Sequence, residues 1–167
     1  MKKYFVRLPL LLVFCTILPY GLRAQNTESP RMKDTHSVRC MFYNTENFFD
    51  AKDDPTKDDA QFLPEGSKKW TDSKMFTKAN NIAKVIIAAG EGRPVELVGL
   101  CEVENAAVIQ VLLKATALSK DEYGYIHYDS NDPRGIDQAL SYHKARVKVL
   151  KADTLSFISP EYGNAGR

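Results

Sequence analysis

Two amphipathic helical patterns that alternate with strand-like runs limit the fold of this chain more than any other feature of its sequence. Apolar residues recur at helical spacing behind the candidate N-caps at 71–73 and stop at Gly90, and a second such pattern covers 105–118. Runs of apolar, β-branched and aromatic residues, which favour strands, lie at 38–43, 96–101, 123–128, 138–142 and 146–158. The order β-α-β-α-β-β-β predicts one domain of the α/β (α+β) class.

The size and charge of the chain exclude several classes of protein. Its 167 residues allow one domain, and 44% hydrophobic with 26% charged residues is a normal globular composition, which excludes disordered and collagen-like chains. The formal net charge is +2, but residues 1–24 carry four basic and no acidic residues. The rest of the chain therefore has no excess of positive charge, and any contact with phosphate must come from a local site or a metal ion.

The N-terminal residues have the pattern of a secretory signal peptide. Basic residues at 2–7 precede an apolar run at 8–20, and Ala24 is a small residue of the kind found before a cleavage site. The apolar run is shorter than the roughly 20 residues of a membrane-spanning helix. We therefore expect removal of residues 1–24 on export to the periplasm or the cell exterior, a flexible lead-in at 25–37, and no membrane span after cleavage.

Two cysteines, Cys40 and Cys101, follow the predicted signal peptide, and both lie in apolar strand-like runs. An oxidising compartment would allow a disulfide between them, whereas burial in the core would leave two free thiols. Buried free thiols are the simpler expectation, and a disulfide is kept as the alternative.

Polar side chains follow the predicted strands, at points where sheet proteins commonly bind ligands. Asn44 comes after the first strand and Glu102 after the second, while Arg134 and Asp137 flank the turn-rich loop before the fourth. A carboxylate and an amide on neighbouring strand ends match the needs of Mg²⁺, which takes one or two protein carboxylates together with phosphate and water. Plainer explanations stay open, because Asn is a common turn former and Glu is favourable in the first turn of a helix.

The acidic stretch at 50–59 and the three histidines give weaker indications of function. The stretch lacks the ligand spacing of an EF-hand, and we expect a solvated loop. His36 falls in the lead-in, His127 within a strand and His143 at a strand end. Each is expected to be an ordinary surface or packed histidine.

Three sequence segments occur in an informative order. They are Phe-Tyr-Asn-Thr-Glu-Asn-Phe-Phe-Asp at 42–50, Gly-Leu-Cys-Glu-Val-Glu-Asn at 99–105 and Pro-Arg-Gly-Ile-Asp-Gln-Ala-Leu at 133–140. In this order they resemble the endonuclease/exonuclease/phosphatase superfamily of DNase I-like, metal-dependent phosphoesterases, and the loop at 53–71 is similar to that of an exported bacterial branch of endonucleases. The resemblance covers about residues 38–150. It implies the first half of a DNase I-like α/β sandwich, a mixed sheet with helices on one face.

The resemblance implies a role for each matching residue. Asn44 corresponds to an Asn that helps to arrange the metal and the scissile phosphate, and Glu102 to the principal Mg²⁺ ligand. Cys101 stands where the family usually has Gln, which removes a polar neighbour of that ligand. Arg134, whose planar fork matches phosphate, is implied to bind substrate, and Asp137 to serve catalysis by orienting a histidine. The implied activity is Mg²⁺- or Mn²⁺-dependent cleavage of a phosphodiester substrate, with nucleic acid as one candidate.

Several motifs of the superfamily are missing from this sequence. They are a histidine in an Asn-His-Trp-Pro-Ser-Arg-like context, an Asp-x-Asn after Gly and a terminal Asp-His pair, to which the resemblance assigns the attacking water and part of the metal site. We therefore expect residues 38–167 to be a truncated domain that does not turn over substrate alone. The alternative is a non-catalytic remnant or binding module.

Overall fold

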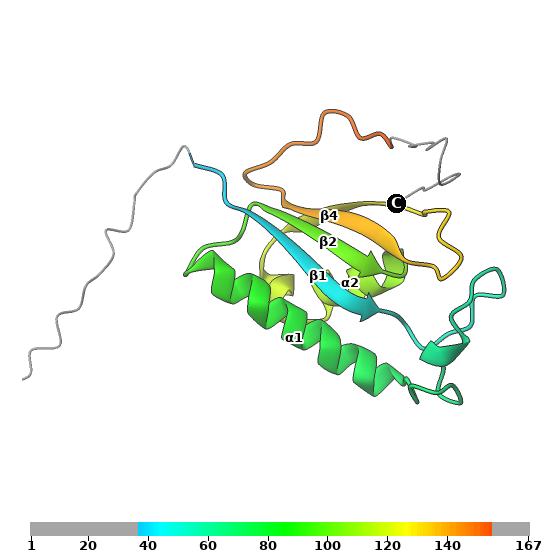
Figure 1. Cartoon of the computed structure of the whole chain (residues 1–167). Coiled ribbons are helices and arrows are strands. Elements are labelled where there is room, and N and C mark those ends of the chain that lie inside the picture. Colours follow the sequence, from blue (N-terminus) through cyan, green and yellow to red (C-terminus); the bar gives the residue numbers. More distant parts are fainter. Residues whose placement is uncertain (1–36, 155–167) are drawn as a thin grey trace, which may run out of the picture. The chain divides into compact units, whose positions relative to one another are not determined.

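Four strands form one mixed sheet in the computed structural model, which describes residues 37–154 (Figure 1). The strands are β1 (Cys40–Phe48), β2 (Leu97–Val103), β3 (Tyr123–Tyr128) and β4 (Asp137–His143). They lie in the order β1-β2-β4-β3, in which β1 and β2 are parallel and the other two pairs are antiparallel. The predicted α/β class and mixed sheet are confirmed.

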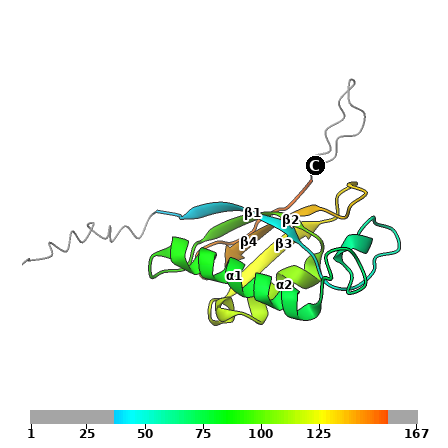
Figure 2. The same ribbon diagram turned by 60° about the horizontal axis from the view of Figure 1, so that its bottom comes forward.

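Both α-helices cover one face of this sheet, as Figure 2 shows. The helices are α1 (Asp72–Gly90) and α2 (Ala106–Lys114), and the loops contain the short 3-10 helices η1 (Ala60–Phe62) and η2 (Ala117–Lys120). Val98 and Leu100 of β2 are buried in one cluster with Ile82 of α1 and with Ile109 and Leu112 of α2. Burial of each such side chain contributes roughly 1.5–3 kcal/mol relative to exposure, and this contribution holds the helices on the sheet.

Within residues 37–154, the opposite face of the sheet carries exposed apolar side chains and no helix. Phe42 of β1 is 72% exposed, and Leu140 of β4 and Tyr128 of β3 are exposed as well. Phe42 and Leu140 line a cavity of about 460 Å³ together with Lys151 from the segment after β4.

The two cysteines lie on β1 and β2 and are both free. Cys40 is exposed and Cys101 is partly buried, so the expected burial of both is wrong. Strand register explains the lack of a disulfide, because Cys101 pairs with Asn44, four positions along β1 from Cys40. At about 3.3 Å per residue that offset is too long for a disulfide.

The predicted helices are present, with ends set by local hydrogen bonds. Thr71 caps α1 by accepting from the Lys74 N–H (3.4 Å), and Glu91, with a φ of 48°, ends it directly after Gly90. Asn105 caps α2 rather than starting it. The second helical pattern forms two helices rather than one. The Thr116 hydroxyl accepts a hydrogen bond from the Leu118 N–H and caps the start of η2.

The predicted strand at 146–158 is wrong over residues 146–154, which form no strand, and residues 155–158 lie outside the described part. The reason is topological. β4 already pairs with β2 on one edge and β3 on the other, so the chain that follows it has no free edge of β4 to join. The predicted signal peptide and His36 also lie outside the described part, and within residues 37–154 no helix is long and apolar enough to span a membrane.

Candidate functional site

Asn44 and Glu102 come together because β1 and β2 both depart from regular pairing at this point. Asn44 pairs with Cys101, so in a regular sheet the next residue, Glu102, would point to the face opposite Asn44. Directly after Cys101, however, β2 has one extra residue relative to β4, and that residue is Glu102. Its φ of 60°, like the 55° and 65° of Glu46 and Asn47, lies in the left-handed region and redirects the side chain.

The carboxylate of Glu102 is held by two donors from β1. Asn44 Nδ2 donates to Oε1 at 3.0 Å, and the backbone N–H of Asn47 donates to Oε2 at 3.1 Å. Asn44 Oδ1 accepts from the Glu46 N–H at 2.8 Å, which fixes the orientation of the amide. Since a carboxylate can accept about four hydrogen bonds, both oxygens of Glu102 keep acceptor capacity.

Arg134 lines the same pocket as Glu102. The pocket has a volume of about 240 Å³, and its polar lining includes Glu102, Asp132, Arg134 and Asp137. Arg134 Nε and Nη2 donate to the two oxygens of Asp132 at 3.0 and 2.8 Å, and these bonds raise the pKa of the guanidinium. The Arg134 side chain is 50% exposed, so solvent and solutes can reach it.

The loop between β3 and β4 rests against the long loop that follows β1. Lys57 Nζ donates to the carbonyls of Ser130 and Asp132, both at 3.2 Å, and the Asp58 N–H donates to the Pro133 carbonyl at 2.8 Å. The first of these bonds joins residues 73 positions apart in the sequence. Tertiary contacts between two irregular segments therefore set the wall of the pocket.

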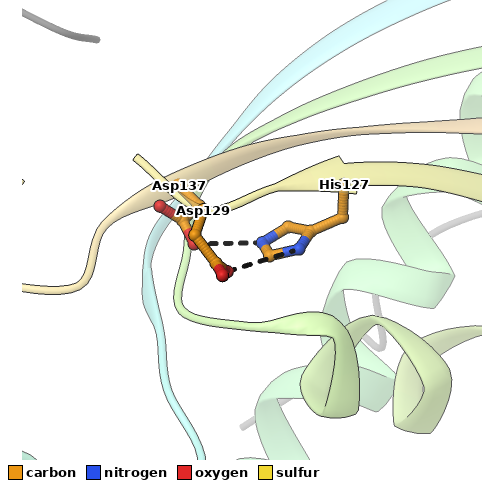
Figure 3. Close-up of side chains that lie close together, drawn as sticks. All are labelled: His127, Asp129 and Asp137. Atoms are coloured by element: carbon orange, nitrogen blue, oxygen red, sulfur yellow. Dashed lines mark hydrogen bonds and ion pairs between the residues drawn. The ribbon is translucent and has the colours of Figure 1, made fainter. Parts of the chain in front are cut away.

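Asp137, at the start of β4, is only 3% exposed, and protein donors bind both of its oxygens. His127 Nε2 donates to Oδ2 at 3.0 Å and the Ser130 N–H donates to Oδ1 at 2.7 Å, while Asp129 lies 3.9 Å from the other ring nitrogen, Nδ1 (Figure 3). Burial alone would raise the pKa of the Asp137 carboxyl, but the hydrogen bonds from His127 and Ser130 outweigh burial and hold it below its ordinary value. The histidine in contact with Asp137 is His127, which was expected to be an ordinary surface or packed histidine.

Lys78 of α1 is a cation near Glu102 that no sequence motif indicated. Its Nζ donates to the Glu46 carbonyl at 2.5 Å and lies 5.6 Å from the centre of the Trp70 ring. Burial lowers the pKa of Lys78, and the nearby carboxylates of Glu46 and Glu102 partly offset that effect. Lys78 thus adds positive charge on the α1 side of Glu102.

The acidic stretch at 50–59 is not uniformly solvated. Asp59 is 2% exposed; its Oδ2 accepts from the Asp54 N–H at 3.0 Å and its Oδ1 has no hydrogen-bond partner. Glu104 accepts from the Asp50 N–H at 2.7 Å, and burial, reinforced by repulsion from the neighbouring aspartates, raises the pKa of Glu104 to about 7. The prediction of a solvated loop is therefore wrong for Asp59, because the loop folds back over its side chain.

The groups around Glu102 fit a hard divalent cation. The Glu102 carboxylate supplies oxygen atoms, which are the ligands that Mg²⁺ prefers, while the Asn44 amide holds that carboxylate through its nitrogen. Cys101 also lines the pocket, and burial and the charge of Glu102 raise the pKa of its thiol, which disfavours the thiolate form that soft metal ions prefer.

A second group of metal-ligand atoms lies at the adjoining ends of β3 and β4. His127, Asp129 and Asp137 each place one such atom within 4.8 Å of the others. The nearer contact of each carboxylate is with a different ring nitrogen: Asp137 bonds Nε2 at 3.0 Å and Asp129 lies 3.9 Å from Nδ1. An ion among these atoms would compete with the hydrogen bonds that Asp137 already accepts from His127 and Ser130.

The structure brings the predicted site residues together in part. Asn44 contacts Glu102, and Glu102, Arg134 and Asp137 line one pocket, although the oxygens of Asp137 are already engaged. Asn44 and Glu102 lie inside strands rather than after them, which corrects the expected strand ends. The sequence patterns missed Asn47, Lys78, Asp132 and His127, whose roles depend on bulges and on contacts between distant segments.

Comparison with known proteins adds information at the level of the family. A model described as Endonuclease/Exonuclease/phosphatase family matches residues 39–164. No curated protein and no solved structure matches the chain. The matched range contains all four strands and all four predicted site residues.

Proposed function

Because the chain belongs to the endonuclease/exonuclease/phosphatase family, we propose that its pocket is the metal- and phosphate-binding part of a site that cleaves phosphodiester bonds. The family comprises hydrolases of the nuclease and phosphatase type that generally depend on a metal ion. The observation that carries the proposal is that Glu102 and the half-exposed Arg134 line one pocket. A carboxylate with spare acceptor capacity beside a planar cation is suited to bind a metal ion and a phosphate group together.

Each residue of the pocket has a distinct task in this proposal. Glu102 would hold Mg²⁺ or Mn²⁺, and Asn44 and the Asn47 N–H keep its carboxylate in place. When bound, the ion supplies polarisation of a phosphate oxygen and neutralisation of its charge. Arg134 would donate to a phosphate oxygen, and Lys78 contributes positive potential near Glu102.

A second candidate is a binding function without turnover. No histidine lines the pocket within residues 37–154, and hydrolysis commonly needs a histidine or a carboxylate that is free to accept a proton from water. Asp132 is engaged with Arg134, and Asp137 with His127 and Ser130. These contacts favour binding of metal and phosphate by this part of the site over complete catalysis by it.

Titration calorimetry with bis-p-nitrophenyl phosphate, with and without Mg²⁺, tests the proposal. We expect Mg²⁺ to increase the affinity for the diester in the unaltered chain and to have no such effect in Glu102→Gln, which keeps the shape of the side chain but loses its charge. Glu65→Gln, at an exposed carboxylate of the long loop, is the matched control. Equal affinities with and without Mg²⁺ in the unaltered chain would contradict the proposal.

Release of p-nitrophenolate from the same diester separates the two candidates. Metal-dependent release that disappears in Glu102→Gln would show that the chain holds a complete catalytic site. Binding without release would favour the second candidate. The natural substrate is proposed only as a phosphodiester, with nucleic acid among the candidates, and export to the periplasm or cell exterior is proposed from residues 1–24.

A further inference from the structure

We propose that His127 is a positioning residue for the pocket: its imidazole fixes the loop between β3 and β4, and through that loop the guanidinium of Arg134. The inference rests on the proposed function for the role of Arg134. The link from His127 to the loop stands on the hydrogen bonds alone. His127 itself does not line the pocket.

The imidazole of His127 is buried and has a carboxylate near each of its two nitrogens. Its side chain is 7% exposed, and it follows Tyr123 and Tyr125 on alternate positions of β3, on the side of the sheet that the helices cover. Nε2 donates to Asp137 at 3.0 Å, and Nδ1 lies 3.9 Å from the exposed Asp129 (Figure 3). A buried ring held in this way has one orientation, because rotation would break its bond to Asp137.

A continuous series of hydrogen bonds runs from this ring to Arg134. Asp137 accepts from His127 at one oxygen and from the Ser130 N–H at the other. The Ser130 hydroxyl then accepts from the Asp132 N–H at 3.1 Å. Asp132 in turn accepts from the backbone N–H, Nε and Nη2 of Arg134.

The loop, residues 129–136, has no helix or strand of its own, so contacts with other segments must hold it. Besides this series, Lys57 and Asp58 donate to its backbone, and both lie in an irregular loop themselves. β3 and β4 are regular, so a side chain bridging their adjoining ends transfers the rigidity of the sheet to the loop. Removal of the imidazole would leave a buried oxygen of Asp137 without its donor, which is unfavourable unless the carboxylate and its loop move.

The same three side chains could instead hold a metal ion, and their geometry disfavours it. An ion takes one ring nitrogen, whereas Asp137 is bonded to Nε2 and Asp129 is nearest to Nδ1. Asp137 also accepts the Ser130 N–H, which leaves less of its capacity for an ion. The arrangement is that of a hydrogen-bonded anchor.

The test compares His127→Ala, His127→Gln and a control, His143→Gln. Gln can place an amide donor near the former position of Nε2. His143 lies at the end of the neighbouring strand β4, and its ring packs on Tyr123, so it is a matched histidine without a link to the loop. Amide hydrogen exchange of Ser130, Asp132 and Arg134 is measured by NMR, together with the affinities for Mg²⁺ alone and for bis-p-nitrophenyl phosphate with Mg²⁺.

In His127→Ala we expect these three amides to exchange at least about tenfold faster, with exchange in α1 and β2 unchanged. The diester affinity should fall by about tenfold, the size of effect that is common when a residue that orients a ligand-binding side chain is removed. The affinity for Mg²⁺ should stay within about twofold. In His127→Gln, the slow exchange of the three amides and the diester affinity should largely be restored. In His143→Gln, both should be the same as in the unaltered chain.

Three results would overturn the proposal. The first is unchanged loop exchange in His127→Ala, and the second is faster exchange throughout the sheet, which would make His127 an ordinary core residue. The third is binding of one equivalent of Zn²⁺ that depends on His127, which would make the group a metal site. If the unaltered chain binds no diester, the proposed function fails, but the exchange measurement still decides whether His127 anchors the loop.

Discussion

Asn44 Nδ2 donates a 3.0 Å hydrogen bond to Oε1 of Glu102, although strand register alone would place the two side chains on opposite faces of the sheet. The bulge at Glu102 and its φ of 60° make this contact. A backbone in the left-handed region at a non-glycine residue costs on the order of 1–3 kcal/mol. The cost falls at the residue that we propose as the metal ligand, which lines the pocket.

Substitution of Asn44 by Ala should weaken metal binding more than folding. The variant loses the donor that orients the Glu102 carboxylate, so the affinity for Mg²⁺ should fall by about tenfold or more. The free energy of unfolding should change by about 1 kcal/mol. Calorimetry measures the metal affinity and urea unfolding the stability. The control is Asn80→Ala, which removes an exposed hydrogen bond from the Asn80 side chain to the backbone of α1. Equal metal affinities in the two variants would show that Asn44 does not support Glu102.

Replacement of Arg134 by Lys should weaken binding of bis-p-nitrophenyl phosphate with Mg²⁺ by about tenfold, because the planar fork is lost while the charge remains. Binding of Mg²⁺ alone should be little changed, since Arg134 is bonded to Asp132 and not to Glu102. The control is Arg146→Lys, near Glu96 at the other end of β2. A Lys variant that binds the diester as tightly as the unaltered chain would remove Arg134 from the proposed site.

Stability should fall as the pH rises, because of Glu104. Its pKa is raised from 4.5 to about 7 in the folded chain, first by burial and then by nearby aspartates, so the folded state binds more protons than the unfolded state over this range. The contribution is complete below about pH 4.5 and is lost as the pH rises through about 7. Its size is on the order of 3 kcal/mol before any discount for partial exposure.

The Glu104→Gln variant isolates this effect. Gln can still accept the bond from the Asp50 N–H but does not ionise. In urea unfolding between about pH 5 and about pH 8, the decline in stability should be smaller in the variant than in the unaltered chain. The same decline in both proteins would assign the pH dependence to other groups.

Export predicts a defined N-terminus for the product. A bacterium that expresses the whole chain should release a form that begins near Gln25, because a signal peptidase would act after Ala24. N-terminal sequencing of the protein recovered outside the cytoplasm measures this. Recovery of that protein with Met1 intact would rule out cleavage.

Periodicity in the sequence was sufficient to locate the four strands and both helices. The helical spacing that ends at Gly90 defined α1 closely, and alternating aromatic residues located β3 (Tyr123–Tyr128) with its observed ends. These elements follow from local propensity and burial, which short windows of sequence contain. Strand pairing is not contained in such windows. The expected strand at 146–158 is therefore wrong over residues 146–154, because β4 is an inner strand with no free edge.

The candidate site was predictable only in its residue types. Motif order located Asn44, Glu102, Arg134 and Asp137 within the sequence. The bulge that turns Glu102 toward Asn44 and the bond between His127 and Asp137 depend on strand register, which no single segment specifies. For the same reason the charge run at 50–59 gave no sign that Asp59 is buried.

The central claim is that Glu102 holds a divalent cation in the pocket, and paramagnetic broadening by Mn²⁺ tests it most directly. In the ¹⁵N NMR spectrum of the unaltered chain, substoichiometric Mn²⁺ should broaden the amide signals of Asn44, Asn47 and Glu102 first, and excess Mg²⁺ should restore them. In Glu102→Gln the same signals should stay sharp, whereas Glu65→Gln should behave like the unaltered chain. Broadening that persists in Glu102→Gln, or that appears first around His127 and Asp129, would contradict the account.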